Sequence, residues 1–414
     1  MSEQNEVLTK IKYLVGDCDI IAGSGSIPAL PAFSDEALAF LSRLSRELRA
    51  VRGIRGHQDI LSYAYWIRKA SLLREKMRTA DVGNRVGRGV AFHIAPSNVP
   101  VNFAVSMTSS LLAGNITVIR VSNKEFEEVD IICDAINKIL EMPEYEAVKR
   151  YICIIRYDHS DAVTEFLSSI CDIRIIWGGD ATIREIRRFP IPTRAVEMCF
   201  ADRYSVAVIN AKKYLGILKD KAEEIAGKFY TDTYYSDQNA CSSPRIVVWL
   251  TEGTGQDDLA LCRETFWDSL QKEADERYDM QPVQAIDKLS NFTELAMSFG
   301  NTVLSKRQNN KLFVIDINDA SEDVFNYKTG GGFFFQYDVK DLEEIVPFLG
   351  KQCQTIAVLG IEKSDVVDLV KRRGVRGVDR VVDFGDTMGL EFVWDGYRMI
   401  ENMSRVIYVY NETI

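Results

Sequence analysis

One of the eight cysteines is set apart by the residues around it. Cys241 lies in the stretch DQNACSSP (237–244), which is small, polar and turn-prone and precedes the β-branched run 246–248. A structural cysteine usually packs among apolar neighbours as a small hydrophobic side chain. A thiol in a turn before a buried strand is instead typical of a nucleophile, which attacks as its thiolate. The alternative is a buried thiol that happens to precede a strand.

Polar residues also follow two apolar runs further upstream. HIAPSNVP (93–100) places Asn98 in a turn directly after a predicted strand, and ITVIRVSNK (116–124) ends a strand at Arg120 and Ser122. Proteins built from α/β units place site residues at such strand ends. Asn98 is therefore a candidate site residue, with a turn-capping side chain as the alternative.

A third predicted strand is followed by two glycines and a helix, in IIWGGDATIREIRR (175–188). Gly178 and Gly179 allow the backbone to approach a ligand, and the N-terminus of the helix can accept a phosphate. Asp180 opposes a phosphate there, and we expect it to cap the helix instead. No G-x-G-x-x-G follows any predicted strand, so a dinucleotide would bind without that fingerprint.

These residues need elements that hold them at one edge of a sheet. Apolar positions at helical spacing predict a helical segment over 34–79. From residue 86, short apolar runs alternate with helical patterns, which indicates βαβ units and mostly parallel sheets; a second such block begins near residue 205. The predicted strands are 89–95, 116–121, 150–157, 173–179, 205–210, 245–250, 311–317 and 355–361, and the predicted helices are 100–114, 127–141, 161–170 and 221–231.

Composition argues against several classes of protein. With 414 residues the chain is long enough for more than one domain, and its net charge of -10 argues against a general nucleic-acid binder. The cysteines form no C-x-x-C pair and the histidines are scattered, so we expect no metal site and a reducing cytosol. The N-terminus shows no signal-peptide pattern, and the charge-free stretch 89–119 is broken by prolines and asparagines. We therefore expect a cytoplasmic protein without a membrane span.

The order of these motifs resembles the aldehyde dehydrogenase superfamily, and most of all its acyl-CoA reductase branch, the LuxC-type fatty acyl reductases of bacterial luminescence. AGNITVIRVSN (113–123) matches the superfamily's strand-end motif, and QNACSSPR (238–245) stands at its nucleophile. PSN (96–98) stands where many members have Pro-Trp-Asn. WDG (394–396) and the lack of an E-L-G-G-K sequence favour the acyl reductase branch. The likeness spans about residues 86 to 400.

The resemblance implies an aldehyde dehydrogenase-like α/β fold with two Rossmann-like parallel-sheet domains. We expect a helical N-terminal segment over 1–85, a cofactor-binding domain over 86–204 and a catalytic domain over 205–375. The remaining segment, 376–414, ends in the strand-like RVIYVY (405–410) and is expected to mediate assembly into a homodimer or homotetramer.

The resemblance also implies a reaction. Cys241 would take a fatty acyl group from a thioester, either acyl-CoA or an acyl-carrying partner protein, and a hydride would then release the fatty aldehyde. Both tetrahedral species carry an oxyanion, for which the Asn98 amide and the Cys241 backbone N–H are the expected donors. Two alternatives remain: a reductase of short-chain acyl-CoA or acyl phosphate, and a non-reducing acyl-carrier subunit.

The cofactor residues are likewise implied by the resemblance. Arg120 stands where the superfamily commonly has a lysine at the adenosine ribose, and Asn123 stands where NAD-preferring relatives carry a glutamate. Loss of that carboxylate and the added charge of Lys124 favour NADPH, with NADH as the alternative. Arg120 and Lys124 are otherwise solvated charges. The implied cofactor contacts are Ala95, Pro96, Ser97, Arg120, Ser122, Lys124, Gly178 and Gly179.

Two further segments have two interpretations each. Glu197 stands roughly where hydrolytic members carry a general base, so it is either a catalytic acid/base or a strand-end salt-bridge partner, and we favour the second. TGGGFFFQYD (329–338) resembles a loop at the edge of the catalytic domain. Its Phe334 and Phe335 are expected to pack in the core rather than to line an acyl channel.

Overall fold

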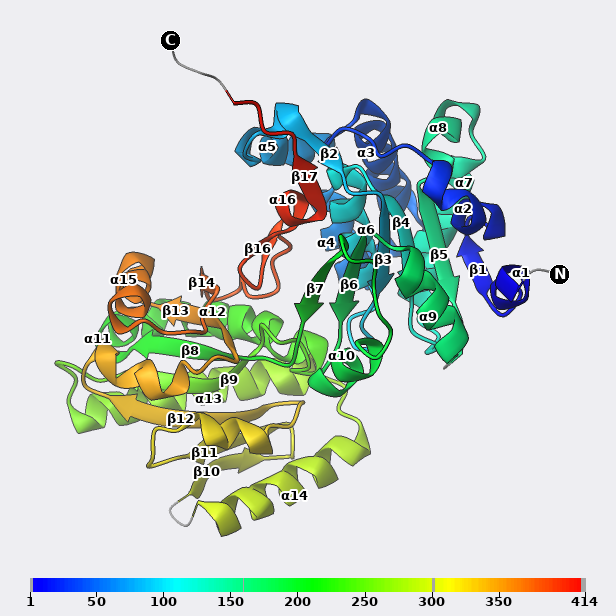
Figure 1. The fold of residues 1–414 in the computed structure, drawn as a ribbon. Helices are drawn as coiled ribbons and strands as arrows, with labels where there is room; N and C mark the ends of the chain where they lie inside the picture. Colours follow the sequence, from blue (N-terminus) through cyan, green and yellow to red (C-terminus); the bar gives the residue numbers. More distant parts are fainter. Residues whose placement is uncertain (1–2, 159, 300–301, 411–414) are drawn as a thin grey trace. The chain divides into compact units, whose positions relative to one another are not determined.

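The computed structural model describes residues 3–158, 160–299 and 302–410. The chain forms two compact units, drawn in Figure 1: the first contains residues 1–201 and 390–414, and the second contains residues 202–389. The predicted segment 376–414 is therefore shared, because residues 376–389 lie in the second unit and the rest in the first. The helical N-terminal residues belong to the first unit together with the sheet that follows them.

The first unit is built on a six-stranded sheet in the order β1-β5-β4-β3-β6-β7. Strands β3 to β7 are parallel, and β1 is antiparallel to β5 at one edge. The central strand β3 is buried along its whole length, as a strand covered on both faces must be. The strands are β1 (Lys12–Val15), β3 (Val90–Ile94), β4 (Ile116–Arg120), β5 (Ile152–Arg156), β6 (Ile173–Trp177) and β7 (Val196–Phe200).

Helices cross over between these strands and precede them. The first long helix, α3, begins where Ser34 Oγ accepts a hydrogen bond from Ala37 N, and its leucines at 41, 44 and 48 are buried at helical spacing. The main helices of this unit are α3 (Asp35–Ala50), α4 (Gln58–Trp66), α5 (Lys69–Arg78), α6 (Asn102–Ala113), α7 (Glu127–Leu140), α9 (Asp161–Ile170) and α10 (Asp180–Ile186). Shorter helices are α1 (Glu3–Leu8), α2 (Cys18–Gly23), α8 (Glu146–Lys149) and α16 (Met399–Met403).

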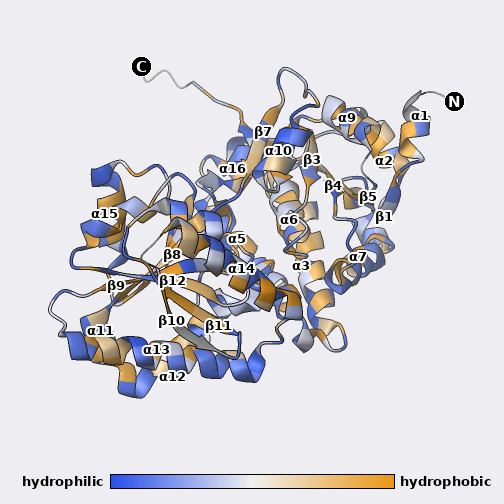
Figure 2. Ribbon diagram, turned by 90° about the horizontal axis from the view of Figure 1, so that it is seen from below, coloured by the Kyte–Doolittle hydropathy of each residue, from blue (hydrophilic) through white to orange (hydrophobic). Residues whose placement is uncertain are grey.

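The second unit is built on a seven-stranded sheet in the order β10-β11-β12-β9-β8-β13-β14. All neighbours are parallel except β10 and β11. Figure 2 shows hydrophobic colour on the strands of this sheet and mixed colour on the helices α12 and α13 that pack on it. The strands are β8 (Tyr204–Asn210), β9 (Pro244–Leu250), β10 (Val303–Gln308), β11 (Leu312–Asp316), β12 (Phe333–Val339), β13 (Cys353–Leu359) and β14 (Arg380–Asp383), and the helices are α11 (Ala211–Leu215), α12 (Leu218–Asp232), α13 (Gln256–Arg277), α14 (Pro282–Ser298) and α15 (Lys363–Arg373).

The expected edge loop at 329–338 is wrong for most of its length. Only residues 329–332 form a loop, and β12 that follows is an interior strand between β11 and β9. Phe334 and Phe335 are both fully buried and belong to two different core clusters, on opposite faces of the sheet. The expectation that they pack in the core is confirmed.

The C-terminal RVIYVY segment forms less strand than its sequence predicts. β17 (Ser404–Val406) pairs antiparallel with β2 (Arg85–Gly87), and the strand ends there. Residues 407–410 follow as apolar, exposed side chains, with Tyr408 80% exposed. Over the described residues, no helix is both long and apolar enough to span a membrane.

A buried carboxylate fastens the end of α12 to a later segment of the second unit. Asp232 accepts hydrogen bonds from Gly385 N at 2.7 Å, Thr387 N at 3.0 Å and Thr387 Oγ at 2.8 Å. Burial raises the pKa of Asp232 to about 6, and these hydrogen bonds only partly oppose the shift. Asp232 therefore binds its proton more strongly in the folded chain than in the unfolded chain.

Asp232→Asn should change how stability depends on pH. In the wild type, stability from this group is fully present below its ordinary pKa near 3.8 and is lost as pH rises through about 6. The amide does not titrate, so the variant should lose about 2 kcal/mol less stability than the wild type between pH 4 and pH 7. A constant offset for its altered hydrogen bonds adds to this difference. Urea unfolding at both pH values measures the difference, and parallel pH profiles for the two proteins would contradict the assignment.

Candidate active site

Cys241 lies between a short 3-10 turn, η5 (Tyr234–Ser236), and strand β9, and is partly exposed. We call residues 237–243 the nucleophile loop. The loop begins with Asp237 and Gln238 in the left-handed region, at φ of 52° and 58°. Non-glycine residues adopt that region at a cost, and such conformations cluster at functional sites. The chain therefore turns sharply at Asp237 and Gln238, shortly before Cys241.

The buried side chain of Gln238 holds the nucleophile loop in place. Its Oε1 accepts hydrogen bonds from Gly332 N at 3.1 Å and Phe333 N at 3.0 Å. Its Nε2 donates to Pro244 O at 3.0 Å and Phe333 O at 3.1 Å. One side chain therefore joins the start of β9 to the start of β12.

The backbone of Cys241 is fixed from the neighbouring strand β8. Ser205 Oγ donates a hydrogen bond to Cys241 O at 2.7 Å. The same Ser205 Oγ accepts a hydrogen bond from Thr355 N on β13 at 3.2 Å. Ser205 is fully buried, so this contact holds the backbone at the cysteine while its thiol stays partly exposed.

The glycines at 330–332 let two loops approach closely. A Cβ at Gly330 would lie 2.3 Å from Asp237 O, and one at Gly332 would lie 2.2 Å from Lys311 O. The buried Lys288 of α14 donates to Gly331 O and to Asn310 O on either side of this contact. Sequence reasoning missed this loop as a support of the nucleophile; the glycine run itself was the available signal.

A buried cation lies next to the nucleophile loop. Arg245, the second residue of β9, is 8% exposed and donates to Thr329 O. Burial lowers the pKa of Arg245 to about 10, and the negative charge of a Cys241 thiolate acts in the opposite direction. This coupling is mutual, so the guanidinium favours the thiolate form of Cys241.

The site residues predicted in the first unit follow β3, β4 and β6. Because β3 lies between β4 and β6 in a parallel sheet, the loops after these three strands share one edge. Ala95 N donates to Arg120 O at 2.9 Å across that edge. Strands β4 and β6 lie on opposite sides of β3, so the chain reverses its order here, which is where open α/β sheets bind ligands.

Ala95 and Pro96 are half-buried at this edge, and Ser97 and Asn98 beside them are exposed. Exposed side chains that follow a fully buried strand are accessible to a ligand at the sheet edge. The cofactor role expected for 95–97 and the oxyanion role of Asn98 both stay predictions.

The end of β4 presents a cation with an unsatisfied donor. Arg120 Nε is buried without a hydrogen-bond partner, and its guanidinium lies 4.8 Å from the centre of the Tyr157 ring. An orphaned buried N–H beside an exposed Lys124 fits an anionic ligand. Ser122 Oγ accepts a hydrogen bond from Lys124 N at 3.2 Å and so shapes this turn.

A carboxylate also reaches this edge, which sequence reasoning did not foresee. Asn123 Nδ2 donates to Asp158 Oδ1 at 3.1 Å, so Asp158 from the loop after β5 stands beside the position of the missing glutamate. An acid here repels a 2′-phosphate and can accept a hydrogen bond from a ribose hydroxyl.

The turn after β6 is tight, but one expectation about it is wrong. Gly178 N donates to Phe200 O at 3.2 Å, and Gly179 is the N-cap of α10. Asp180 is therefore the first helical residue and not the cap we expected. Its charge still favours the positive end of the helix dipole.

Glu197 lies in an ion-pair cluster at the beginning of its strand. Its Oε2 accepts from the buried Arg174 at 2.5 Å and its Oε1 from Arg187 at 2.6 Å. Burial opposes ionisation of Glu197, but hydrogen bonds from Arg187 and Arg174 outweigh it and lower the pKa. Glu197 is the second residue of β7, whereas the cofactor loops follow the other ends of the strands. The position is thus near the strand start and not at its carboxyl end, and the carboxylate is a poor proton acceptor.

Two other cysteines, Cys171 and Cys199, have environments that disfavour the thiolate. Burial raises the pKa of Cys171 to about 12. Burial and the charge of Glu197 raise the pKa of Cys199 to about 11. Neither thiol is expected to react at neutral pH.

Arg245→Met should slow alkylation of Cys241 because it removes the neighbouring cation while keeping an unbranched buried side chain. We expect iodoacetamide to react with Cys241 about tenfold more slowly at pH 7, the equivalent of about one pKa unit in thiolate fraction. Peptide mass spectrometry over pH 5–10 measures the rate, and Arg245→Lys, which restores the charge, should recover part of it. An unchanged rate in a folded Arg245→Met protein would contradict the role.

Comparison with a protein family covers almost the whole chain. Residues 26–406 match the family model described as "Acyl-CoA reductase (LuxC)". The match includes every strand of the two main sheets except β1, together with the nucleophile loop and the exposed turn after β3.

Two curated relatives carry similar descriptions. The chain is 22% identical over 305 residues to a "Long-chain acyl-protein thioester reductase" of Aliivibrio fischeri, covering 72% of this chain and 58% of the relative. It is 22% identical over 309 residues to "Long-chain acyl-protein thioester reductase 2" of Photobacterium leiognathi, covering 72% and 59%. The matched region thus spans less than two thirds of these relatives.

Solved structures show the same fold at low identity. A benzaldehyde dehydrogenase from Corynebacterium glutamicum is 13% identical, with a TM-score of 0.63 over 93% of this chain and 87% of that chain. Lactaldehyde dehydrogenase from Escherichia coli is 13% identical, with a TM-score of 0.64 over 95% and 89%. The fold is therefore aldehyde dehydrogenase-like, and with the family model matching 26–406, the chain belongs to the acyl-CoA reductase (LuxC) family.

Proposed function

We propose that this protein reduces a long-chain fatty acyl thioester to the fatty aldehyde through an acyl group held on Cys241, with NADPH as the hydride donor. The observation that carries the proposal is a partly exposed thiol whose backbone is fixed by Ser205 and whose neighbour is the buried cation Arg245. The curated relatives are described as acyl-protein thioester reductases, which supports this class of substrate.

In the first half-reaction, Cys241 Sγ attacks the acyl carbonyl carbon as a thiolate. The new C–S bond forms an oxyanion intermediate, which collapses by breaking the bond to the carrier sulfur. The carrier leaves as a thiolate and takes a proton from solvent. Arg245 lowers the energy of the attacking thiolate, and the Gln238 hydrogen bonds keep the nucleophile loop from shifting during attack.

In the second half-reaction, a bound reduced nicotinamide would supply the hydride that the acyl carbon needs. Cys241 Sγ would then leave the thiohemiacetal oxyanion as the thiolate that began the cycle, releasing the aldehyde. The net reaction consumes one thioester, one NADPH and one proton, and yields aldehyde, carrier thiol and NADP⁺. Asn98 and the Cys241 backbone N–H are the proposed donors to both oxyanions.

Reduction requires that water does not hydrolyse the acyl-enzyme first. Glu197, the residue that would activate water by analogy with hydrolytic relatives, accepts hydrogen bonds from Arg174 and Arg187 on its two oxygens. A carboxylate paired in this way has a lowered pKa and takes up a proton poorly. We therefore leave Glu197 out of the proposed chemistry and give it a structural role.

The phosphate end of the cofactor fits the edge formed by β4 and its following turn. Arg120 has a buried donor without a partner, and Lys124 adds a second positive charge. Gly178 and Gly179 remain the proposed backbone contacts after β6. Asp158 acts against the 2′-phosphate, so the proposed preference for NADPH over NADH is small.

The acyl donor is proposed to be acyl-CoA or an acyl-carrying protein, and the protein is proposed to form a homodimer or homotetramer. Apolar side chains at 407–410 are exposed beyond β17, and exposed apolar segments of this kind are usually covered by a partner. Their location at the end of the paired strand β17 agrees with assembly through the C-terminal segment.

Cys241→Ala should abolish both acyl labelling and cofactor oxidation. With palmitoyl-CoA and NADPH, we expect the rate measured at 340 nm to fall by at least about 10³-fold, and Asn98→Ala to lower it by about 10²–10³-fold. Mass spectrometry of the trapped acyl-enzyme locates the acyl group. Cys199→Ala is the matched control and should keep most of the activity.

The outcomes separate the proposed reductase from its alternatives. Labelling of Cys241 without oxidation of NADPH or NADH would leave a non-reducing acyl carrier and refute the reductase. Faster turnover of acetyl-CoA or acetyl phosphate than of palmitoyl-CoA would refute the long-chain assignment. Labelling that persists in Cys241→Ala would refute the nucleophile.

Asp158→Asn should increase the preference for NADPH. Removing this carboxylate removes its repulsion of a 2′-phosphate and an acceptor for a ribose hydroxyl, while the amide can still contact Asn123. We expect the ratio of kcat/KM for NADPH to that for NADH to rise about three- to tenfold. Asp161→Asn, at the start of α9, controls for a general change in charge. An unchanged ratio would place the adenosine ribose elsewhere.

A further inference from the structure

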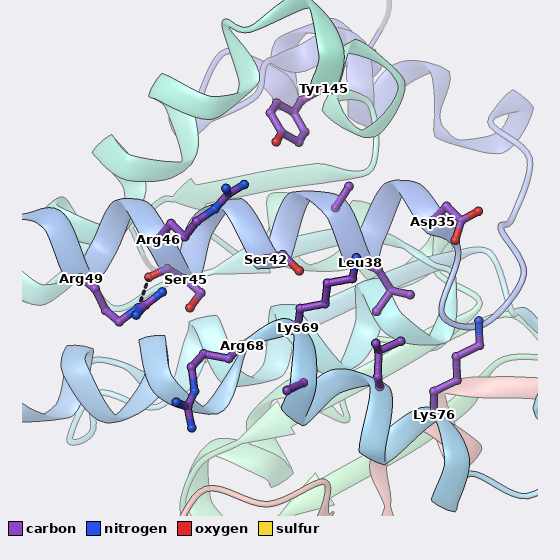
Figure 3. Close-up of a pocket in the computed structure, with 13 residues that line it drawn as sticks. Asp35, Leu38, Ser42, Ser45, Arg46, Arg49, Arg68, Lys69, Lys76 and Tyr145 are labelled. Carbon is purple, nitrogen blue, oxygen red and sulfur yellow. Dashed lines mark hydrogen bonds between the residues drawn. The ribbon is translucent and has the colours of Figure 1, made fainter.

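A groove of about 920 Å³ runs along the first unit between helices α3 and α5. Figure 3 shows Arg46 and Arg49 on α3, with Arg68 and Lys69 at the start of α5 and Lys76 further along it. The chemistry proposed above uses none of them. We call this the basic groove.

The basic groove holds an unusual excess of positive charge for this protein. The chain carries a net charge of -10, yet five of the lining residues are cationic and one, Asp35, is acidic. Among the described residues, none of the five forms an ion pair with a carboxylate. The nearby acid of α3, Glu47, is already paired with Arg43 and Lys138. The groove cations are therefore available to an anionic partner.

Two of the arginines are held in position by the protein. Arg68 Nε donates to Tyr65 O at 3.0 Å and its guanidinium lies 5.0 Å from the centre of the Tyr65 ring. Arg49 Nε donates to Ser45 O at 3.1 Å and its guanidinium lies 5.6 Å from the same ring. These contacts restrict both guanidinium groups before a partner binds, which lowers the entropy cost of binding.

Between the cations the groove has an apolar floor and one unsatisfied hydroxyl. Leu38 is buried and Leu73 is 39% exposed, and both line the groove. Ser42 Oγ is buried without a hydrogen-bond partner. An unsatisfied buried hydroxyl at the floor of an open groove is a site for a ligand's polar group.

The dimensions distinguish a protein segment from a small anion. From Asp35 to Arg49, α3 spans about 21 Å at 1.5 Å per residue. A small anion binds best where buried donors converge, but Arg46 and Arg49 are exposed near the end of α3, and Arg68 and Lys69 are exposed at the start of α5. Exposed cations from two helices, in a groove that also contains the apolar side chains of Leu38 and Leu73, match an amphipathic helix with an acidic face.

We propose that the basic groove docks an acidic amphipathic helix of the protein that carries the acyl thioester. The inference rests on the proposed function, because the proposed partner is the acyl donor of that reaction. It deepens that function by naming an acidic protein as the donor, in addition to acyl-CoA. Long-range attraction between the row of cations and an acidic donor would speed their encounter and make it sensitive to salt.

Arg46→Glu/Lys69→Glu tests the proposal by reversing one exposed charge on each helix. The probes are palmitoyl-acyl carrier protein, a small acidic helical protein bearing a thioester, and palmitoyl-CoA. Fluorescence anisotropy measures binding of the labelled carrier protein without cofactor, and oxidation of NADPH measures turnover of each donor. We expect the Kd for the carrier protein to rise at least about fivefold and turnover of palmitoyl-CoA to stay within about twofold.

Lys219→Glu/Lys221→Glu is the matched control, because it makes the same change of charge on exposed residues of α12. It should bind the carrier protein as the wild type does. An unchanged Kd in the groove variant, an equal loss in the control, or equally tight binding of anionic lipid vesicles would overturn the proposal. Absence of turnover with both donors would refute the proposed function alone, since the anisotropy measurement still decides the groove.

Discussion

The buried amide of Gln238 is the interaction on which the nucleophile loop depends. Its four hydrogen bonds use both ends of the amide and reach two strands, β9 and β12, that are neighbours in the sheet. A buried polar group left without partners costs about 1–3 kcal/mol, so other arrangements of this loop are disfavoured. The two left-handed residues that open the loop are tolerated for the same reason. Cys241 can then be partly exposed to a substrate and still be held in position by Ser205.

Two ion environments in the protein have opposite chemical consequences. Arg245 is a buried cation beside Cys241, and a negative charge on Cys241 raises the pKa of Arg245. The positive charge of Arg245 in turn favours the thiolate form of Cys241. Around Glu197, two arginines engage both carboxylate oxygens and lower its pKa. The first arrangement favours a nucleophilic thiolate, and the second makes a carboxylate a poor base. Under the proposed function, both favour hydride transfer to an acyl group on Cys241 over its hydrolysis.

Charge also organises the surfaces that meet other molecules. The protein is acidic as a whole, but cations gather at the end of β4 and along the basic groove. At β4 the carboxylate of Asp158, which accepts a hydrogen bond from Asn123, opposes these cations. In the groove Asp35 alone opposes them, and their spread along two helices suits a partner that is long and acidic. The end of β4 and the basic groove both use arginine and lysine, so they differ in geometry and not in residue type.

The sequence by itself determined the alternation of strands and helices, since the predicted elements from 89 to 250 each correspond to an observed one. It also predicted that Cys241 lies in a turn before a strand, because small, turn-prone polar residues surround it and a β-branched run follows. Sequence could not place β12, since three consecutive phenylalanines after glycines carry no period that separates a buried strand from a loop. Tertiary structure alone decided that Gln238 and Arg245 support the nucleophile, that Asp158 reaches Asn123, and that Glu197 is paired, because each contact joins residues whose spacing in the chain encodes no interaction. Several of these contacts exist because pairing of parallel strands places segments that are distant in the chain beside one another, as with Arg174 on β6 and Glu197 on β7.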